Sequence, residues 1–137
     1  MVGQQTRASL FELAVQLKKG TKETLPDRMH QTLVRKIRNP AELIVVSMTR
    51  NDDDFTHREN YAAVSCAIQN LALSLHASGY GSKWSTGKIT RHDKTYAMLN
   101  IDATQEEIVG FIWAGVPESI PKAPERPALH QVVRTIE

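Results

Sequence analysis

Cysteine is almost absent from this sequence, and long apolar runs and a strong excess of one charge are absent altogether. The single cysteine, Cys66, cannot form an internal disulfide. With no recognisable signal peptide, this predicts a cytoplasmic protein rather than a disulfide-stapled secreted one. The longest purely aliphatic run, Leu43–Val46, is far shorter than the roughly 20 apolar residues of a membrane helix. We therefore exclude a membrane-spanning class.

The charges are balanced and scattered. Lysine and arginine total 17 against 15 aspartates and glutamates, which gives a net charge of +2. A nucleic-acid-binding face is usually strongly basic, so no nucleic acid partner is indicated. The chain has 137 residues, of which 41% are apolar and 23% charged. These values are typical of one soluble globular domain, and we assign residues 1–137 to a single domain.

Hydrophobic periodicity predicts helices and strands along the chain. Two segments are apolar on both faces, which is typical of interior strands. The last part, from Pro117, holds four of the six prolines and is predicted to be an extended tail over 117–137. The predicted helices cover 6–18, 26–38 and 58–78, the predicted strands cover 42–49 and 105–116, a short extended segment covers 82–86, and a brief helix capped by Thr90 continues to about Leu99.

The predicted helix over 58–78 carries very little charge between Tyr61 and Leu75. A helix that is apolar nearly all round needs cover on every side, and the other predicted elements are too few to supply it. We therefore expect a second copy of the chain to cover it, as a homodimer. On this helix Cys66 is expected to be a buried, inert thiol, and His76 to have a structural role near the C-terminus.

No pattern of metal ligands or of a catalytic triad stands out. The acidic run Asp52–Asp54 lacks the ligand spacing of a calcium loop and is interpreted as a solvated turn. The five histidines show no zinc-binding spacing. We therefore predict no metal site and assign no catalytic side chain.

The segment Gly79–Lys88 superficially resembles two nucleotide-binding motifs. A dinucleotide fingerprint fails because Trp84 stands where a glycine is needed and because a helix precedes the segment. A phosphate-binding P-loop fails because five residues separate its two glycines and Ile89 replaces a hydroxyl residue. Two interpretations stay open: the amides and hydroxyls after Trp84 contact a flat heterocycle, or Trp84 is a core anchor beside a turn.

Arg126 lies in a stiff Pro-Glu-Arg-Pro sequence. A guanidinium held in this way suits a phosphate group. The alternative is an ordinary surface arginine.

Taken together, these segments resemble the nitroreductase family of flavin-dependent oxidoreductases. The resemblance is carried by Glu59–Leu73 leading into Gly79–Gly87, by Glu107–Pro117 and by the tail with Arg126. It runs from about residue 7 to residue 133. It implies an α+β fold, a three-layer α/β/α sandwich with a central, mainly antiparallel sheet, in an intertwined homodimer.

The resemblance also implies FMN as the cofactor, bound at the subunit interface, and NAD(P)H as the electron donor. Electrons would pass to a nitroaromatic or quinone-like acceptor by a ping-pong mechanism. Relatives begin with a helix carrying phosphate-binding arginines, and this sequence starts after it, so the alternative is a non-catalytic binding or dimerisation module. The implied cofactor-binding residues are Trp84, Ser85, Thr86 and Gly87 along the flavin, Arg126 at its phosphate, and Ser74 and Gly79 in a stretch associated with the nicotinamide cofactor.

Overall fold

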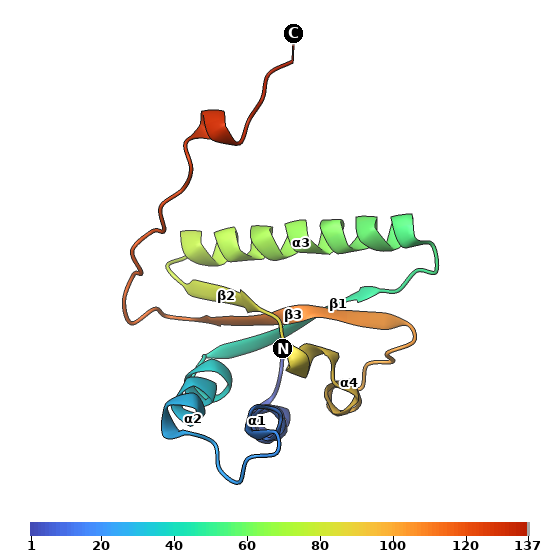
Figure 1. The fold of residues 1–137 in the computed structure, drawn as a ribbon, viewed down its shortest axis with the longest axis vertical. Helices are drawn as coiled ribbons and strands as arrows, with labels where there is room; N and C mark the ends of the chain where they lie inside the picture. Colours follow the sequence, from blue (N-terminus) through green and yellow to red (C-terminus); the bar gives the residue numbers. More distant parts are fainter. Residues whose placement is uncertain (137) are drawn as a thin grey trace.

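The computed structural model describes residues 1–136, and Glu137 lies outside the described residues. Helices surround a three-stranded sheet, and a long tail leaves the body at the end of the last strand (Figure 1). The strands are β1 (Glu42–Thr49), β2 (Gly81–Ser85) and β3 (Glu106–Gly115). The helices are α1 (Gln4–Lys19), α2 (Asp27–Leu33), α3 (Asp54–Ala77) and α4 (Asp93–Leu99), with a π-helical turn η1 (Val34–Arg38) and two 3-10 turns, η2 (Lys88–Arg91) and η3 (Leu129–Gln131).

The sheet has the order β1-β3-β2, and both neighbours run antiparallel to β3. β3 occupies the centre because it is the longest strand and is apolar on both faces. The pairing of β1 with β3 shifts at Val46/Ser47, where β3 carries one unpaired residue, Val109. Such a bulge turns Val109 and Gly110 toward the same face. Both predicted long strands are confirmed, and the predicted segment 82–86 begins one residue earlier, at Gly81.

Each face of the sheet packs on different helices (Figure 1). One face carries α1, α2 and α4 over a cluster that includes Leu10, Leu43 and Phe111. The other carries α3 over a smaller cluster that includes Ile68 and Ile112. Burial of these side chains is the main favourable contribution to folding. The expected mixture of helices with an antiparallel sheet is therefore confirmed.

The two predicted helices on the first face are present, with one difference in their apolar stripe. Leu33 and Ile37 are buried against the sheet as expected. Met29, predicted on the same stripe, is 41% exposed. The predicted helix 26–38 also changes form, because its last turn is the π-helix η1. A π-helical turn shifts the direction of the side chains that follow it.

The brief helix before β3 is not capped by Thr90, so that prediction was wrong. Its cap is His92, whose ring Nδ1 accepts a hydrogen bond from the Lys94 amide at 3.2 Å. Thr90 lies one turn earlier, in η2, and is 2% exposed. Its hydroxyl donates to the Gly87 carbonyl at 2.9 Å. Thr90 thus closes the turn that follows β2.

The acidic turn before α3 has a capping role. The Asp53 carboxylate accepts hydrogen bonds from the amide and the hydroxyl of Thr56, at 2.8 and 2.7 Å. An aspartate at this position satisfies a free amide of the first turn, and α3 therefore begins at Asp54 rather than at the predicted Arg58. Over residues 1–136 no group of three or more potential metal ligands gathers.

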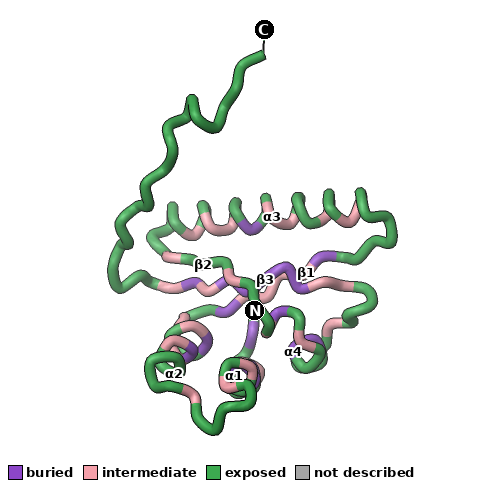
Figure 2. The backbone as a smooth tube through the Cα atoms, viewed as in Figure 1, coloured by how far each residue is buried: buried purple, intermediate pink, exposed green. Residues whose placement is uncertain are grey.

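The helix α3 is covered on only one side by its own chain (Figure 2). Of its 24 residues only Ile68 is buried, and Leu73 is 56% exposed. The prediction that the Cys66 thiol is buried is wrong for the single chain, because Cys66 is exposed. His76 is also exposed. The physical reason is that, within residues 1–136, α3 lies alone on its face of the sheet, so its outer side is not covered by another helix or strand.

The proline-rich tail follows β3 as an extended, exposed segment (Figure 2). It runs past the end of α3 and away from the sheet (Figure 1). Within the described part of the chain, no helix has the length and apolar character needed to cross a bilayer.

Candidate functional site

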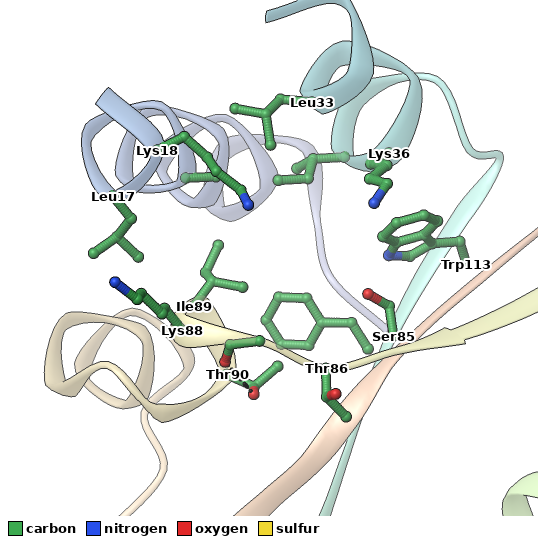
Figure 3. Close-up of a pocket in the computed structure, with 14 residues that line it drawn as sticks. Leu17, Lys18, Leu33, Lys36, Ser85, Thr86, Lys88, Ile89, Thr90 and Trp113 are labelled. Atoms are coloured by element: carbon green, nitrogen blue, oxygen red, sulfur yellow. Dashed lines mark hydrogen bonds between the residues drawn. The ribbon is translucent and has the colours of Figure 1, made fainter. Parts of the chain in front are cut away.

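A cavity of about 550 Å³ lies on the α1/α2 face of the sheet, beside the end of β2. Volumes of roughly 300–1,000 Å³ are typical of sites for small molecules and cofactors. Figure 3 shows the side chains around it. Its apolar wall includes Leu17, Leu33, Ile89 and Phe111, and its polar lining includes Lys18, Lys36, Ser85, Thr86, Lys88, Thr90 and the Trp113 indole.

Three of the predicted flavin-contacting residues, Ser85, Thr86 and Gly87, lie together in this lining. The chain leaves β2 at Ser85 and turns at Gly87, whose φ of 155° is a conformation that residues with a side chain rarely adopt. Steric crowding is not the reason for a glycine at position 87, because a Cβ there would meet nothing within 4 Å. The turn is fixed by Thr90, whose amide donates to the Gly87 carbonyl at 3.1 Å.

The fourth residue of that segment, Trp84, lies on the other face of the sheet. Successive side chains of a strand point to opposite faces, so Trp84 points away from the cavity that Ser85 lines. Its indole Nε1 donates to the Val109 carbonyl at 3.4 Å, and its ring lies against Gly110, where a Cβ would overlap it. The structure therefore places Trp84 beside α3, 38% exposed, rather than in the cavity of its own chain.

The remaining predicted residues also lie outside this cavity. Gly79 borders a second hollow, of about 460 Å³, where α3, β2 and the start of the tail meet. Ser74 is exposed on α3, and Arg126 is exposed in the tail. Neither residue belongs to the lining of the first cavity.

Lysine ammonium groups dominate the electrostatics of the cavity. Lys18, Lys36 and Lys88 line it, and in the part of the chain that the structure describes its lining contains no carboxylate. The Lys36 Nζ lies 5.3 Å from the centroid of the Trp113 ring, and the Lys83 Nζ lies 5.7 Å from it. Partial burial lowers the pKa of Lys36, and repulsion from Lys83 and Lys18 lowers it further. The cavity is thus suited to a ligand with negative charge.

Sequence reasoning did not find these lysines or Trp113. The available signal was their position next to core residues: Lys18 follows Leu17, and Lys36 precedes the buried Ile37. A charged residue beside a core position at the end of a helix is common, so this pattern alone does not identify a binding site. Only the folded chain brings α1, α2 and β3 together at one place.

The family model of the nitroreductases, described as "Nitroreductase family", matches residues 3–116. The chain belongs to the nitroreductase family. This match covers α1 through β3, and so includes every element that lines the cavity.

Several family relatives are similar to this chain. The Bacillus subtilis (strain 168) protein "Putative NAD(P)H nitroreductase YfhC" is 22% identical over 120 residues, which cover 88% of this chain and 61% of that protein. The chain thus spans about three fifths of the length of that relative. A nitroreductase-like protein from Bacillus cereus has a TM-score of 0.80 and 24% identity, over 99% of this chain and 70% of that one.

A third relative was solved with a flavin. It is described as a putative nitroreductase in complex with FMN, from Desulfovibrio desulfuricans. Its TM-score is 0.62 and its identity 20%, over 99% of this chain and 86% of that chain. At these identities the structural likeness shows the nitroreductase fold.

Proposed function

We propose that this nitroreductase-family chain is an FMN-dependent oxidoreductase that transfers electrons from NAD(P)H to nitroaromatic or quinone-like acceptors in the cytoplasm. The observation that carries the proposal is the cavity itself: predicted flavin-contacting residues and a cluster of lysines line one site of cofactor size. When bound, FMN would supply the redox chemistry, accepting a hydride from the donor and later reducing the acceptor in a ping-pong sequence.

The residues of the cavity fit the parts of FMN. The apolar wall, with Phe111 and Ile89, suits an aromatic ring system. The turn at Ser85–Gly87 offers backbone and hydroxyl groups to the polar edge of that ring. Lys18 and Lys88 offer positive charge for a phosphate at the end away from Trp113 (Figure 3). A flavin can transfer electrons without a side-chain acid or base, so the site needs no catalytic triad.

A second copy of the chain would complete the site, and we propose the intertwined homodimer and three-layer sandwich that the family resemblance implies. Two observations support this assembly. The outer side of α3 is exposed and carries Tyr61 and Leu73, and the tail exposes apolar side chains that include Ile120 and Val132. Exposed large apolar side chains that gather on one surface are typical of interaction sites. In the dimer, Arg126 would reach the FMN phosphate of the other copy.

The same assembly would give roles to the predicted residues that lie outside the cavity. Trp84 and Ser74 lie on the α3 side of the sheet, and Gly79 lies just after the C-terminal end of α3. This is the side on which the second copy is proposed to dock. We propose that Trp84 contributes to the flavin site by supporting the Ser85–Gly87 segment from the α3 face of the sheet, and that Ser74 and Gly79 contribute to the nicotinamide contact.

An absorption spectrum of the purified protein, with added FMN, tests the proposal. We expect flavin bands at one FMN per chain, and bleaching of those bands by NADH or NADPH without oxygen. A colourless protein that does not take up added FMN would contradict the enzyme function and favour the non-catalytic module.

The phosphate contacts have a sharper test, because riboflavin lacks the phosphate. Lys88→Gln and Arg126→Ala should each weaken FMN binding about tenfold, since a hydrogen bond to a charged group contributes about 1.5–3 kcal/mol. Riboflavin binding should stay the same in both variants. Lys94→Gln on α4, outside the cavity lining, is the charge-matched control. Equal losses for FMN and riboflavin would remove these residues from the phosphate site.

The dimer is tested by sedimentation. Leu73→Asp should shift the protein toward the monomer, because it would bury a charge in the proposed interface. Met98→Asp, at a side chain of 36% exposure on α4, is the control on the opposite side of the sheet. A wild-type protein that sediments as a monomer at all concentrations would refute the assembly.

A further inference from the structure

One corner of the cavity carries groups that the flavin proposal does not use, the Lys36 ammonium and the Trp113 indole. Lys36, Ser85 and Trp113 of the lining form this corner together with Lys83, which lies beside Trp113 outside the lining, and we call it the polar corner. Figure 3 shows the Lys36 ammonium, the Ser85 hydroxyl and the Nε1 edge of Trp113 at the same end of the cavity, away from Lys88. Lys83 joins them from β2, on the strand position paired with Trp113.

The indole of Trp113 has an unused donor. Its Nε1 is buried, and nothing within residues 1–136 accepts a hydrogen bond from it. Buried polar groups in proteins almost always have partners, because an unpaired donor costs free energy of desolvation. An acceptor atom on a ligand would satisfy this one.

The positive charges of the two lysines in the corner have no negatively charged partner among the described residues. Throughout the described residues, neither Lys36 nor Lys83 forms an ion pair within 4.0 Å, while each ammonium lies within 6 Å of the same indole ring. Two like charges over one ring repel each other and gain little in water. A single anion between them would remove the repulsion and bind to both.

We propose that the polar corner binds the carboxylate of a planar aromatic ligand, and that the electron acceptors of this chain are therefore aromatic acids. A carboxylate has two oxygens with about four acceptor positions, which is enough for two ammonium groups and the indole N–H together. A neutral amide of the same shape has one acceptor oxygen and would turn an NH₂ group toward a lysine. The aromatic ring of the ligand would extend from the polar corner into the part of the cavity that FMN leaves open. That this ligand is the electron acceptor rests on the proposed function.

The test compares benzoate with benzamide, which have nearly the same shape and differ in charge. Calorimetric titration of the protein, both as purified and after loading with FMN, gives the two dissociation constants. We expect benzoate to bind at least tenfold more tightly than benzamide to the wild-type chain. Lys83→Gln and Trp113→Phe should each reduce this preference severalfold, because each removes one donor. Lys22→Gln, in the exposed loop between α1 and α2, removes the same charge elsewhere and should leave the preference unchanged.

Each outcome bears on the inference separately from the flavin function. Equal binding of benzoate and benzamide to FMN-loaded protein would overturn the polar corner and leave the oxidoreductase proposal standing. If both variants keep the wild-type preference for benzoate over benzamide, the anion binds elsewhere, and the polar-corner inference is likewise overturned. Failure to take up FMN would refute the function, whereas the benzoate titration of the cofactor-free protein would still decide the inference. Circular dichroism of Trp113→Phe checks its folding, and Lys83→Gln, at an exposed position, keeps the test valid if that variant unfolds.

Discussion

Replacement of Gly110 by alanine should destabilise the protein through a collision with Trp84. Gly110 lies in the central strand, where its backbone is held by pairing with β1. A Cβ at this position would overlap the Trp84 indole and lie 3.1 Å from the Ser85 carbonyl. Since the strand cannot move easily, the indole must swing outward, lose its hydrogen bond to the Val109 carbonyl and give up its packing.

The expected cost follows from these contacts. Overpacking a well-ordered site typically costs about 1–3 kcal/mol, and a lost hydrogen bond contributes about 0.5–1.5 kcal/mol of it. Because Trp84 is 38% exposed, the ring has room to move, and we expect a loss of about 2 kcal/mol. For a chain of this size this corresponds to a fall in melting temperature on the order of 5–10 °C.

Denaturant unfolding of four proteins tests the mechanism: wild type, Gly110→Ala, Trp84→Ala and the double variant, all at one protein concentration. If the collision causes the loss, Gly110→Ala should cost little once the indole is removed, and the two changes should couple by at least 1 kcal/mol. Tryptophan emission of Gly110→Ala should also shift to longer wavelength as Trp84 becomes more exposed. An equal loss in both backgrounds would refute the reasoning, because the cost would then come from the strand itself.

Three further predictions concern other positions. Tyr96→Phe should lower the free energy of unfolding, measured by urea titration, by about 1–3 kcal/mol. The buried Ile108 amide donates to the Tyr96 hydroxyl at 3.0 Å and would lose its partner. Tyr80→Phe, at an exposed ring, should have little effect in the same titration. Hydrogen bonds from a backbone amide and a hydroxyl in the first turn of α3 lower the pKa of Asp53 below its usual 3.8, so its contribution to stability is complete above that pH and is lost as the pH falls through the lowered pKa. Asp53→Asn keeps a capping oxygen and should reduce this acid sensitivity, and an unchanged acid-unfolding curve would contradict the role. Lys36→Gln should raise the melting temperature of the ligand-free protein at neutral pH, since burial and neighbouring lysines lower the pKa of Lys36 and thus disfavour its charged form; no rise in a thermal melt would show that the repulsion is negligible.

The strands could be predicted from the sequence because their signal is local. β1 and β3 are continuous β-branched and apolar runs, and their predicted ends lie within one residue of the observed ends. The start of α3 was misplaced because its determinant is a cap. Asp53 was interpreted as part of a solvated turn, and its hydrogen bonds to Thr56 extend the helix by four residues. A cap depends on backbone geometry that hydrophobic periodicity does not contain.

The site could be predicted only in part, for a similar reason. The segment Ser85–Gly87 was predicted from its glycine and hydroxyl residues and from the family resemblance, and it lines the cavity. The same resemblance assigned Trp84 to the flavin, and its side chain lies on the other face of the sheet because adjacent residues of a strand point to opposite faces. The lining lysines and Trp113 come from four separate elements, α1, η1, η2 and β3, and their association depends on the tertiary packing of the helices against the sheet.

The strand that carries the cavity turn, β2, lies at the border of the sheet and has one hydrogen-bonded neighbour over five residues. Border strands of this length open at a lower free energy than central strands. A molecule that occupies the cavity would add contacts to this strand and to the central strand β3, and not to β1. Amide protons at 83–87 should therefore exchange more slowly with solvent deuterium when the cavity is filled, while those of the opposite border keep their rates.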